Sequence, residues 1–355
     1  MADSPIFEFA SSSLHPFATS PLRILFCRLG GIGDVLHTLP LVKYLRKRYP
    51  NSSIEYITSS SVADLLESHC PYINKVWVYN KREQSKIAHK ILQYQDERQK
   101  TVGKIDYFFN LHNSFSFYFF NLFFIKAKQF FQYKKDKNVH AVINFARTYD
   151  KSISAFELES KTLIETDSAH LLKKYNLQEN KYICLVPGVG TSRIQRAWPF
   201  ENWFSLAKKF LFIEKNIKIV FLGGEDERKM FDGWVEKDPV INLIGKLSLP
   251  DTAKIISNSL KVISGDTGLL HLASALSKKV VGLYGPTLPK RTGPFTSEYQ
   301  ILVAKNCKCI NKIWDIKKCK MTKLPKGFCM DSLTVDNVLT NVSSELVGKQ
   351  IKSVF

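Results

Sequence analysis

The chain alternates short apolar runs with stretches in which apolar residues recur at a helical spacing. In its first half, predicted strands are residues 22–27, 53–58, 75–79 and 105–111, and predicted helices are residues 35–49, 63–68 and 81–100. The pattern restarts near residue 180, with strands predicted at residues 181–186, 218–222, 261–264 and 279–284, and helices at residues 203–212, 249–257 and 268–275. This alternation predicts parallel sheets covered by helices.

Two such sets predict an α/β fold of two doubly wound, Rossmann-like domains that face a central cleft, where a ligand is expected. The length of 355 residues, 45% of them hydrophobic, is enough for two domains of about 150 residues each. The predicted boundaries are an N-terminal extension at residues 1–20, a first domain at 21–175, a second domain at 176–335 and a C-terminal helix or tail at 336–355.

Residues 107–125 form the one uncharged stretch that merits comparison with a membrane span. Asn110, His112 and Asn121 are among the polar residues that interrupt it, and amides without partners are costly in lipid. We therefore predict a strand, a loop and a helix, with residues 112–114 at the sheet edge where open α/β folds bind ligands. Residues 1–21 lack the apolar core of a signal peptide, so we expect a cytoplasmic protein.

An excess of basic residues favours an anionic partner. Fifty-one Lys and Arg against 32 Asp and Glu give a formal net charge of +19. Nucleic acid, an anionic membrane surface and a phosphorylated substrate all fit this charge. An AT-rich genome that enriches Lys at solvated positions is an equal alternative. Because no nucleic-acid-binding motif is recognisable, we expect no nucleic-acid partner.

Seven cysteines, an odd number in a chain expected in the cytoplasm, argue against a disulfide framework. Cys307, Cys309, Cys319 and Cys329 cluster late in the sequence. Such a set can close a tetrahedral zinc or iron site, although the C-x-C spacing is tighter than the usual C-x-x-C. The other three cysteines lie in apolar surroundings and are expected to be buried.

A first glycine loop, with Gly30, Gly31 and Gly33, follows the first predicted strand and leads into a helix. Such glycines let backbone amides face a ligand at the helix N-terminus, but the spacing is not the G-x-G-x-x-G of dinucleotide-binding proteins. A nicotinamide-dependent enzyme is therefore disfavoured. Asp34 starts the helix, and a capping carboxylate and a catalytic group are equal interpretations of it.

A second loop contains Asp266, Thr267, Gly268 and His271, and it again follows an apolar strand and opens a helix. Free backbone amides, the positive end of the helix and the Thr267 hydroxyl can hold a pyrophosphate. The alternative is an ordinary helix cap by Asp266, with His271 as its partner one turn later.

Between the two loops, residues 191–199 are rich in groups that bind phosphate, including Thr191, Ser192 and Arg196. Arginine is suited to a diphosphate leaving group, whose negative charge grows as the bond to that group breaks. A solvated surface arginine is the alternative.

Three motifs together, GDVLHTLP at residues 33–40, TSRIQRAWP at 191–199 and SGDTGLLH at 264–271, resemble glycosyltransferase family 9, the ADP-heptose:lipopolysaccharide heptosyltransferases. The resemblance extends from about residue 22 to about residue 338 and keeps the motifs in order. The first motif is most similar to that of heptosyltransferase I, which adds the first heptose to the Kdo-lipid A acceptor.

The resemblance implies a GT-B fold with the acceptor in the N-terminal domain and the nucleotide sugar in the C-terminal domain. It implies transfer of heptose from ADP-L-glycero-D-manno-heptose to Kdo-lipid A with inversion, and Asp34 as the base. Arg196 stands where the family usually has a Lys that neutralises the donor phosphates. The residues expected around the donor are Thr191, Ser192, Arg196, Glu227, Leu247, Asp266, Thr267, Gly268 and His271.

The sequence lacks an Asp-x-Asp pair, so we expect no cofactor for catalysis, with basic side chains and helix dipoles opposing the donor charge instead. The acidic acceptor implies peripheral association with the inner face of the inner membrane. A related group that glycosylates adhesins holds iron with C-terminal cysteines, which leaves a protein acceptor as an alternative. A nucleotide-sugar-binding protein without catalysis is the third possibility.

Overall fold

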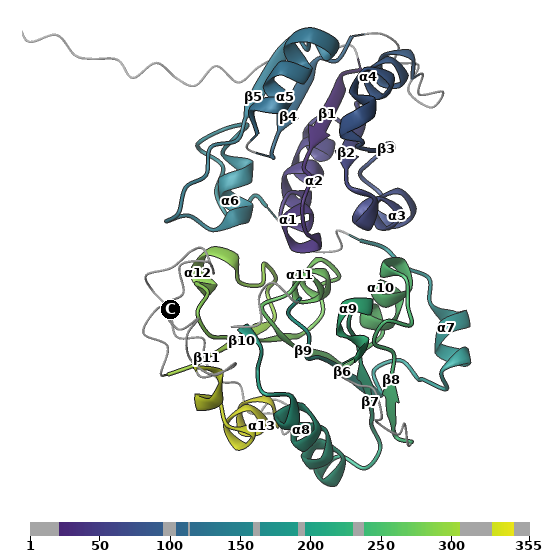
Figure 1. The fold of residues 1–355 in the computed structure, drawn as a ribbon, viewed down its shortest axis with the longest axis vertical. Coiled ribbons are helices and arrows are strands. Elements are labelled where there is room, and N and C mark those ends of the chain that lie inside the picture. The colour runs from purple at the N-terminus through teal and green to yellow at the C-terminus, as the bar shows by residue number, and fades with distance from the viewer. Residues whose placement is uncertain are drawn as a thin grey trace, which may run out of the picture.

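The computed structural model describes residues 21–94, 104–112, 114–158, 164–190, 196–229, 238–305 and 329–343. These residues form two α/β halves, which lie one above the other in Figure 1. Each half is built on one sheet whose strands are all parallel. The predicted fold of two doubly wound domains is confirmed.

The sheet of the first half has the strand order β3-β2-β1-β4-β5. Its strands are β1 (Arg23–Cys27), β2 (Ser53–Thr58), β3 (Lys75–Val78), β4 (Tyr107–Asn110) and β5 (Gln129–Gln132). The helices are α1 (Ile32–Leu36), α2 (Leu39–Arg48), α3 (Ser60–His69), α4 (Gln84–Gln93), α5 (Phe115–Phe120) and α6 (Ala141–Ala146), with a 3-10 turn at Lys81–Glu83 and a π turn at Asn121–Ile125. Because β1 pairs with β4, the segments that follow these two strands begin side by side.

The sheet of the second half has the order β11-β10-β9-β6-β7-β8. Its strands are β6 (Tyr182–Val186), β7 (Lys218–Phe221), β8 (Val240–Asn242), β9 (Lys261–Gly265), β10 (Val280–Tyr284) and β11 (Tyr299–Val303). The helices are α7 (Ala169–Lys174), α8 (Phe200–Ile213), α9 (Glu225–Arg228), α10 (Leu249–Ser257), α11 (Gly268–Ala275), α12 (Pro289–Thr292) and α13 (Val335–Ser343), with a 3-10 turn at Met330–Ser332.

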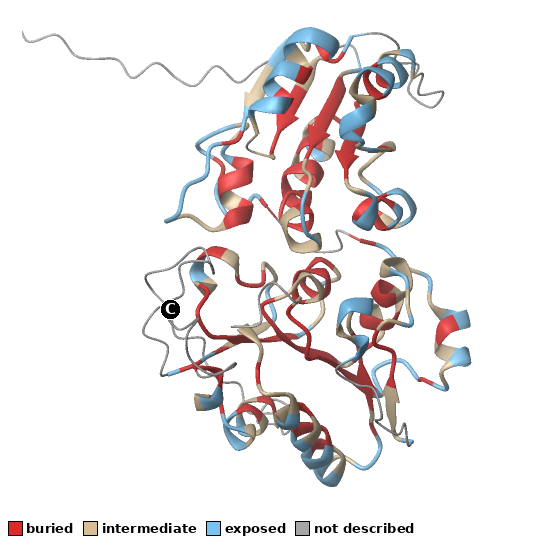
Figure 2. Ribbon diagram, in the orientation of Figure 1, coloured by how far each residue is buried: buried red, intermediate tan, exposed pale blue. Residues whose placement is uncertain are grey.

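Strands β1, β6, β9 and β10 are buried over their whole length, as the red arrows of Figure 2 show. Successive residues of β1 enter different clusters: Ile24 and Phe26 join one, and Leu25 and Cys27 join the other. Both faces of the strand are therefore covered, which is why its sequence is a continuous apolar run. The three cysteines predicted to be buried, Cys27, Cys70 and Cys184, are buried.

The stretch predicted as one helix at residues 35–49 is two helices, α1 and α2. Pro40 lies in the first turn of α2. A proline has no N–H to donate, and its ring would clash with the carbonyl four residues earlier in a continuous helix. The helix therefore stops after Leu36 and restarts at Leu39.

Three strands, β5, β8 and β11, were not predicted. All three lie at the edges of their sheets, where one side has no neighbouring strand. Their sequences mix polar and apolar residues, and none of the three is buried throughout. An apolar run, which identified the central strands, is therefore missing from them.

Two helices near the predicted domain boundaries belong with the second half. Helix α7 precedes the predicted boundary at residue 175 but packs on α10. Helix α13 packs on α8, so residues 336–343 belong to the second half as well.

The uncharged stretch at residues 107–125 has the predicted strand, loop and helix, namely β4, a loop that includes residues 111, 112 and 114, and α5, which continues into the π turn. Within the described ranges, we find no helix with the length and apolar character needed to cross a bilayer.

A buried ion pair joins β1 to β2 inside the first half. Arg23 Nη2 lies 2.5 Å from Glu55 Oε1, and both side chains are almost inaccessible to solvent. Arg23 also donates to the Ile91 carbonyl at 2.9 Å, and Trp77 Nε1 donates to Glu55 Oε2 at 2.9 Å. Each buried charge thus has several partners, which offset the cost of removing it from water.

We predict that Glu55→Gln lowers the free energy of unfolding by about 3 kcal/mol, because it leaves the Arg23 charge buried without a carboxylate. Urea denaturation of the full chain measures this change. The matched control is Glu83→Gln, which breaks the exposed Lys86–Glu83 pair and should cost about 0.5 kcal/mol or less. Equal losses in the two variants would contradict the structural role of the buried pair.

Candidate active site between the two halves

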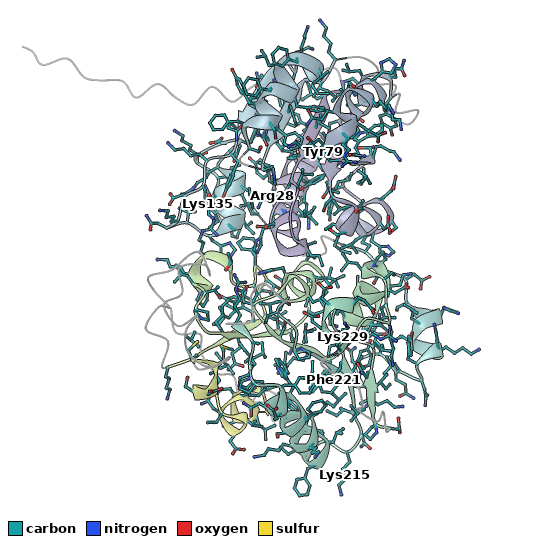
Figure 3. All side chains as sticks on the ribbon, viewed as in Figure 1. Arg28, Tyr79, Lys135, Lys215, Phe221 and Lys229 are labelled. Atoms are coloured by element: carbon teal, nitrogen blue, oxygen red, sulfur yellow. The ribbon has the colours of Figure 1, made fainter. Side chains whose placement is uncertain are left out.

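A cavity of about 940 Å³ lies between the two halves, which is a usual volume for a small-molecule site. From the first half it is lined by Arg28, Gly31, Gly33, Asp34, His37, His112, Tyr133 and Lys135, among others. From the second half it is lined by Gly188, Arg196, Glu227, Leu247, Asp266, Thr267, Gly268, His271 and Arg291, among others. Figure 3 labels Arg28 and Lys135 on the part of the first half that faces the second. The predicted cleft is present, and His112 at the tip of β4 faces it as expected.

Helices α1 and α11 approach each other closely at two glycines. A Cβ atom on Gly33 would lie 2.4 Å from His271 Cδ2, and one on Gly268 would lie 2.8 Å from Ile32 Cβ. Both distances are shorter than side-chain contacts allow, so this packing requires glycine at both positions. Gly33 therefore packs against the other half, in addition to any backbone role that the loop has toward a ligand.

Asp34 lies in the first turn of α1 and pairs with Arg28, which follows β1. Asp34 Oδ1 is 2.9 Å from Arg28 Nη2, and the Asp34 side chain is 47% exposed. Arg28 is itself fixed, because Nη1 donates to the Leu111 carbonyl at 2.8 Å and the guanidinium lies over the Phe145 ring. The N-cap position belongs to Gly31, so an ion pair and not a helix cap holds the Asp34 carboxylate. A fixed and partly open carboxylate can accept a proton from a bound hydroxyl.

Asp266 follows β9 and is buried beside Arg196. Its Oδ2 atom lies 2.8 Å from Arg196 Nη1, which also donates to the Asp266 carbonyl at 3.2 Å. His271 Nε2 is 3.7 Å from Asp266 Oδ1. Burial alone would raise the pKa of Asp266, but Arg196 and His271 more than offset it, and the pKa lies below its usual value. Asp266 is therefore ionised and orients Arg196 toward the cavity wall.

Thr267 is the N-cap of α11. Its Oγ1 atom accepts from the Leu270 N–H at 3.4 Å and lies 3.3 Å from Ser264 Oγ. The hydroxyl that was predicted to hold a pyrophosphate is thus also a helix cap. Gly268, in the first turn of α11, lines the cavity, and this turn offers an anion its backbone amides and the positive end of the helix.

Glu227 connects the glycine loops that follow β6 and β7. Its Oε1 atom accepts from the Gly190 N–H at 3.0 Å, and Oε2 accepts from the Gly224 N–H at 2.6 Å. A Cβ atom on Gly188 would lie 2.0 Å from Glu227 Cδ, so the carboxyl needs this glycine beside it. Glu227 and Leu247 both line the cavity on the side of the second half.

The sequence model of glycosyltransferase family 9 (heptosyltransferase) matches residues 125–321 of the chain. The chain belongs to glycosyltransferase family 9. It is 25% identical over 321 residues to lipooligosaccharide heptosyltransferase 2 of Haemophilus ducreyi, covering 79% of this chain and 88% of the relative. It is 23% identical over 321 residues to lipopolysaccharide heptosyltransferase 1 of Escherichia coli, covering 82% of this chain and 96% of the relative.

The fold of this glycosyltransferase is also that of solved members of the family. The structure of E. coli ADP-heptose LPS heptosyltransferase II superposes with a TM-score of 0.72 at 20% identity, covering 92% of this chain and 99% of the other. This similarity confirms the GT-B fold. Relatives named heptosyltransferase 1 and heptosyltransferase 2 have similar identities, so identity does not separate these two types for this chain.

The family site brings most of the predicted residues into one cavity. Arg196, Glu227, Leu247, Asp266, Thr267, Gly268 and His271 line it together with Asp34. Thr191 and Ser192 lie outside the described residues, as do Cys307, Cys309 and Cys319, while Cys329 is buried. Among the described parts of the chain, no group of three His, Cys, Asp or Glu side chains is placed to hold a metal ion.

Three histidines that sequence analysis gave no joint role gather where the halves meet. The His37 ring centroid is 4.3 Å from that of His271 and 5.8 Å from that of His140. His140 Nε2 donates to the Gly293 carbonyl at 3.2 Å, and its Nδ1 accepts from the Val142 N–H at 3.3 Å, which is the neutral tautomer. Burial lowers the pKa of His37 and lowers that of His140 to about 4.

Arg28, Tyr133, Lys135 and Arg291 also line the site and were not predicted to do so. Arg28 carries a signal in the sequence, because it directly follows a buried strand and precedes the glycine loop. Tyr133 and Lys135 follow β5, which was not predicted as a strand, and Arg291 follows β10. Their positions depend on the strand order, which a single sequence does not contain.

We predict that Gly33→Ala destabilises the protein, because the new methyl group meets His271 Cδ2. The cost should be about 1–3 kcal/mol of unfolding free energy, set against a gain of up to about 1 kcal/mol in helix propensity. Thermal unfolding followed by circular dichroism measures the change. Gly31→Ala is the matched control, because a Cβ there would meet nothing within 4 Å, and a similar loss in both variants would refute the packing role.

We also predict that stability falls as the pH drops below the usual histidine pKa. The folded pKa of His140 is about 4, so its contribution is present above the unfolded value near 6.5 and is lost as the pH falls toward 4. The expected loss from this residue is about 2 kcal/mol between about pH 7 and about pH 5.

Urea denaturation at the two pH values checks this prediction. His140→Gln should reduce the dependence by about this amount and leave the part that comes from His37, whose pKa burial also lowers. His170→Gln changes an exposed histidine of α7 and should keep the native dependence. If His140→Gln also keeps it, the burial of a neutral His140 is not the cause.

Proposed function

We propose that the protein is an inverting heptosyltransferase that transfers heptose from ADP-L-glycero-D-manno-heptose to the Kdo-lipid A inner core of lipopolysaccharide. One observation carries the proposal: Asp34 on α1 faces the same cavity as Arg196 and the N-terminus of α11. A carboxylate on one wall and a site for a diphosphate on the other are what sugar transfer from a nucleotide diphosphate needs. The names of the relatives, which include an ADP-heptose transferase, support the donor.

The donor diphosphate would lie at the first turn of α11 beside Arg196. Two effects favour an anion there, the positive end of the helix and the guanidinium, and both grow in importance as the leaving ADP gains charge. Glu227 would contact the ribose and Leu247 the adenine, in keeping with their places on the same wall. Because the guanidinium and the positive end of the helix already oppose the charge of the diphosphate, we propose that the reaction needs no cofactor.

The transfer itself would be a single displacement. The acceptor oxygen attacks the anomeric carbon from the side opposite the diphosphate, Asp34 takes the hydroxyl proton, and the bond to ADP breaks with its electron pair on the leaving oxygen. Arg28 keeps the Asp34 carboxylate in place before the attack. Because bond formation and bond breaking occur on opposite faces of the carbon, the configuration inverts.

The acceptor side of the cavity is suited to an acidic oligosaccharide. Arg28 and Lys135 line it from the first half and Arg291 lines the cavity from the second, so Kdo carboxylates would find counter-charges there. A lipid-linked acceptor would place the enzyme at the inner face of the inner membrane as a peripheral protein. A protein acceptor is the alternative that a C-terminal metal would favour, and three of the four cysteines predicted for that zinc or iron site lie outside the described residues.

We predict that Asp34→Asn lowers acceptor-dependent ADP release from ADP-heptose by about 10²–10⁴-fold, the usual contribution of a general base. The amide cannot accept the proton but keeps the size of the side chain. Affinity for ADP-heptose, measured by calorimetry, should change little because the donor lies on the other wall.

Asp64→Asn is the matched control, since Asp64 is exposed on α3 and does not line the cavity. Near-native turnover by Asp34→Asn would remove Asp34 as the base. Failure of the native protein to bind ADP-heptose would remove the donor, and binding without turnover on Kdo-lipid A would direct the search to other acceptors or to a protein that has lost catalysis.

A further inference from the structure

The outer side of the first half carries six large apolar side chains in contact with solvent on one short element. Helix α5 and the π turn that continues it leave them exposed, from 38% for Phe124 to 84% for Phe115. Figure 2 shows much of this element in the colour of exposed residues. We call this set the aromatic face: Phe115, Tyr118, Phe119, Leu122, Phe123 and Phe124.

The element is apolar on both of its sides. Phe117, Phe120 and Ile125 point inward and are buried against the core next to the sheet. Phe119 and Phe123 are on the outside and stack with their ring centroids 6.1 Å apart. A surface helix usually turns a polar side to solvent, so an apolar outer side indicates a partner that is itself apolar.

The segment that carries the aromatic face has charged residues of one sign only. No Asp or Glu occurs from Tyr107 to Lys135. Lys126 directly follows the π turn and is exposed, and Lys134 and Lys135 are exposed just after β5. Lys128 is also exposed and pairs with Asp106 at the border of the segment. The partner is therefore expected to carry negative charge beside its apolar region.

We propose that the aromatic face docks on an anionic lipid bilayer and lies in its interface. Anionic lipid headgroups over an acyl core offer both properties that the face requires, negative charge and an apolar layer. The eleven residues Phe115–Ile125 would be only about 16 Å long as a helix, about half of the hydrocarbon thickness, so the element lies on the membrane without crossing it.

A second copy of the chain fits the face less well. A symmetric dimer through this surface would bring the lysines of both copies into one interface, and like charges at close range repel. An acidic bilayer has no such conflict.

The same segment connects the aromatic face to the cavity. His112 lines the cavity just before α5 and packs edge-on against Phe117, with centroids 6.0 Å apart. Tyr133 and Lys135 line the cavity just after β5. The docking proposal extends the proposed function and rests on it for the lipid-linked acceptor, whose sugar would enter the cavity while its lipid stays in the membrane.

The test is flotation of the full chain with vesicles, without donor or acceptor. Vesicles of phosphatidylcholine alone are compared with vesicles that contain about one third phosphatidylglycerol. We expect the native protein to float with the anionic vesicles. The triple variant Phe115→Ser/Phe119→Ser/Phe123→Ser should bind them at least about tenfold more weakly. The matched control is Phe212→Ser on α8, since Phe212 is as exposed as Phe115, at 84%, but lies on the second half.

Thermal unfolding and ADP-heptose binding show whether the triple variant is folded. We expect it to be folded, because all three side chains point outward. Equal flotation of the triple variant and the native protein would overturn the proposal, and so would a native protein that floats with neither vesicle. A monomer–dimer equilibrium in sedimentation that the triple variant abolishes would assign the face to a second copy instead. Vesicle binding is measured without ADP-heptose. A failure of the proposed transfer reaction can therefore be told apart from a failure of membrane docking.

Discussion

The close packing of α1 on α11 determines where the other groups of the site lie. Gly33 leaves room for the His271 ring and Gly268 leaves room for Ile32, so the two helix N-termini meet across the boundary between the halves. Each helix brings its positive end to the same cavity. A larger side chain at either glycine would move Asp34 away from Arg196 and separate the two walls on which the proposed transfer depends.

Two aspartates at this junction have different surroundings and hence different capacities. Asp266 is buried and tied to Arg196 and His271, so its carboxylate serves to place its neighbours. Among the residues that the structure describes, Asp34 pairs with Arg28 and remains about half open, so it can still exchange a proton with a bound molecule. One residue type thus has two roles, and the environment decides between them. The proposed base is the aspartate with the incomplete set of partners.

Much of the fold could be predicted because central strands are buried on both faces and therefore appear as apolar runs. Strand β2 and helices α10 and α11 have the predicted bounds. Edge strands such as β5 lack this signal, and the break between α1 and α2 needed the position of Pro40 to be weighed against the helical spacing.

For a related reason, the sequence predicted the residues of the donor wall but not the basic residues that join the site from elsewhere in the fold. The resemblance of three motifs supplied the residues of the donor wall, whereas the ion pair of Arg28 with Asp34 is a contact between two ends of one loop that spacing does not reveal. The residues after β5, such as Lys135, join the site only because β5 pairs with β4, and that pairing is a property of the folded sheet.

The aromatic segment shows how structure resolves a choice that sequence leaves open. A run of phenylalanines fits a buried helix and a lipid-facing helix equally well, because both are apolar. Successive residues on a helix are rotated by about 100°, so one short run can serve both purposes. Phe117 and Phe120 complete the core, while Phe119 and Phe123 remain in water. Because burying one such ring is worth about 1.5–3 kcal/mol, the outer rings gain more from an apolar surface than the folded chain alone provides. The segment from Tyr107 to Lys135 that carries them contains no Asp or Glu, which favours a surface that is anionic.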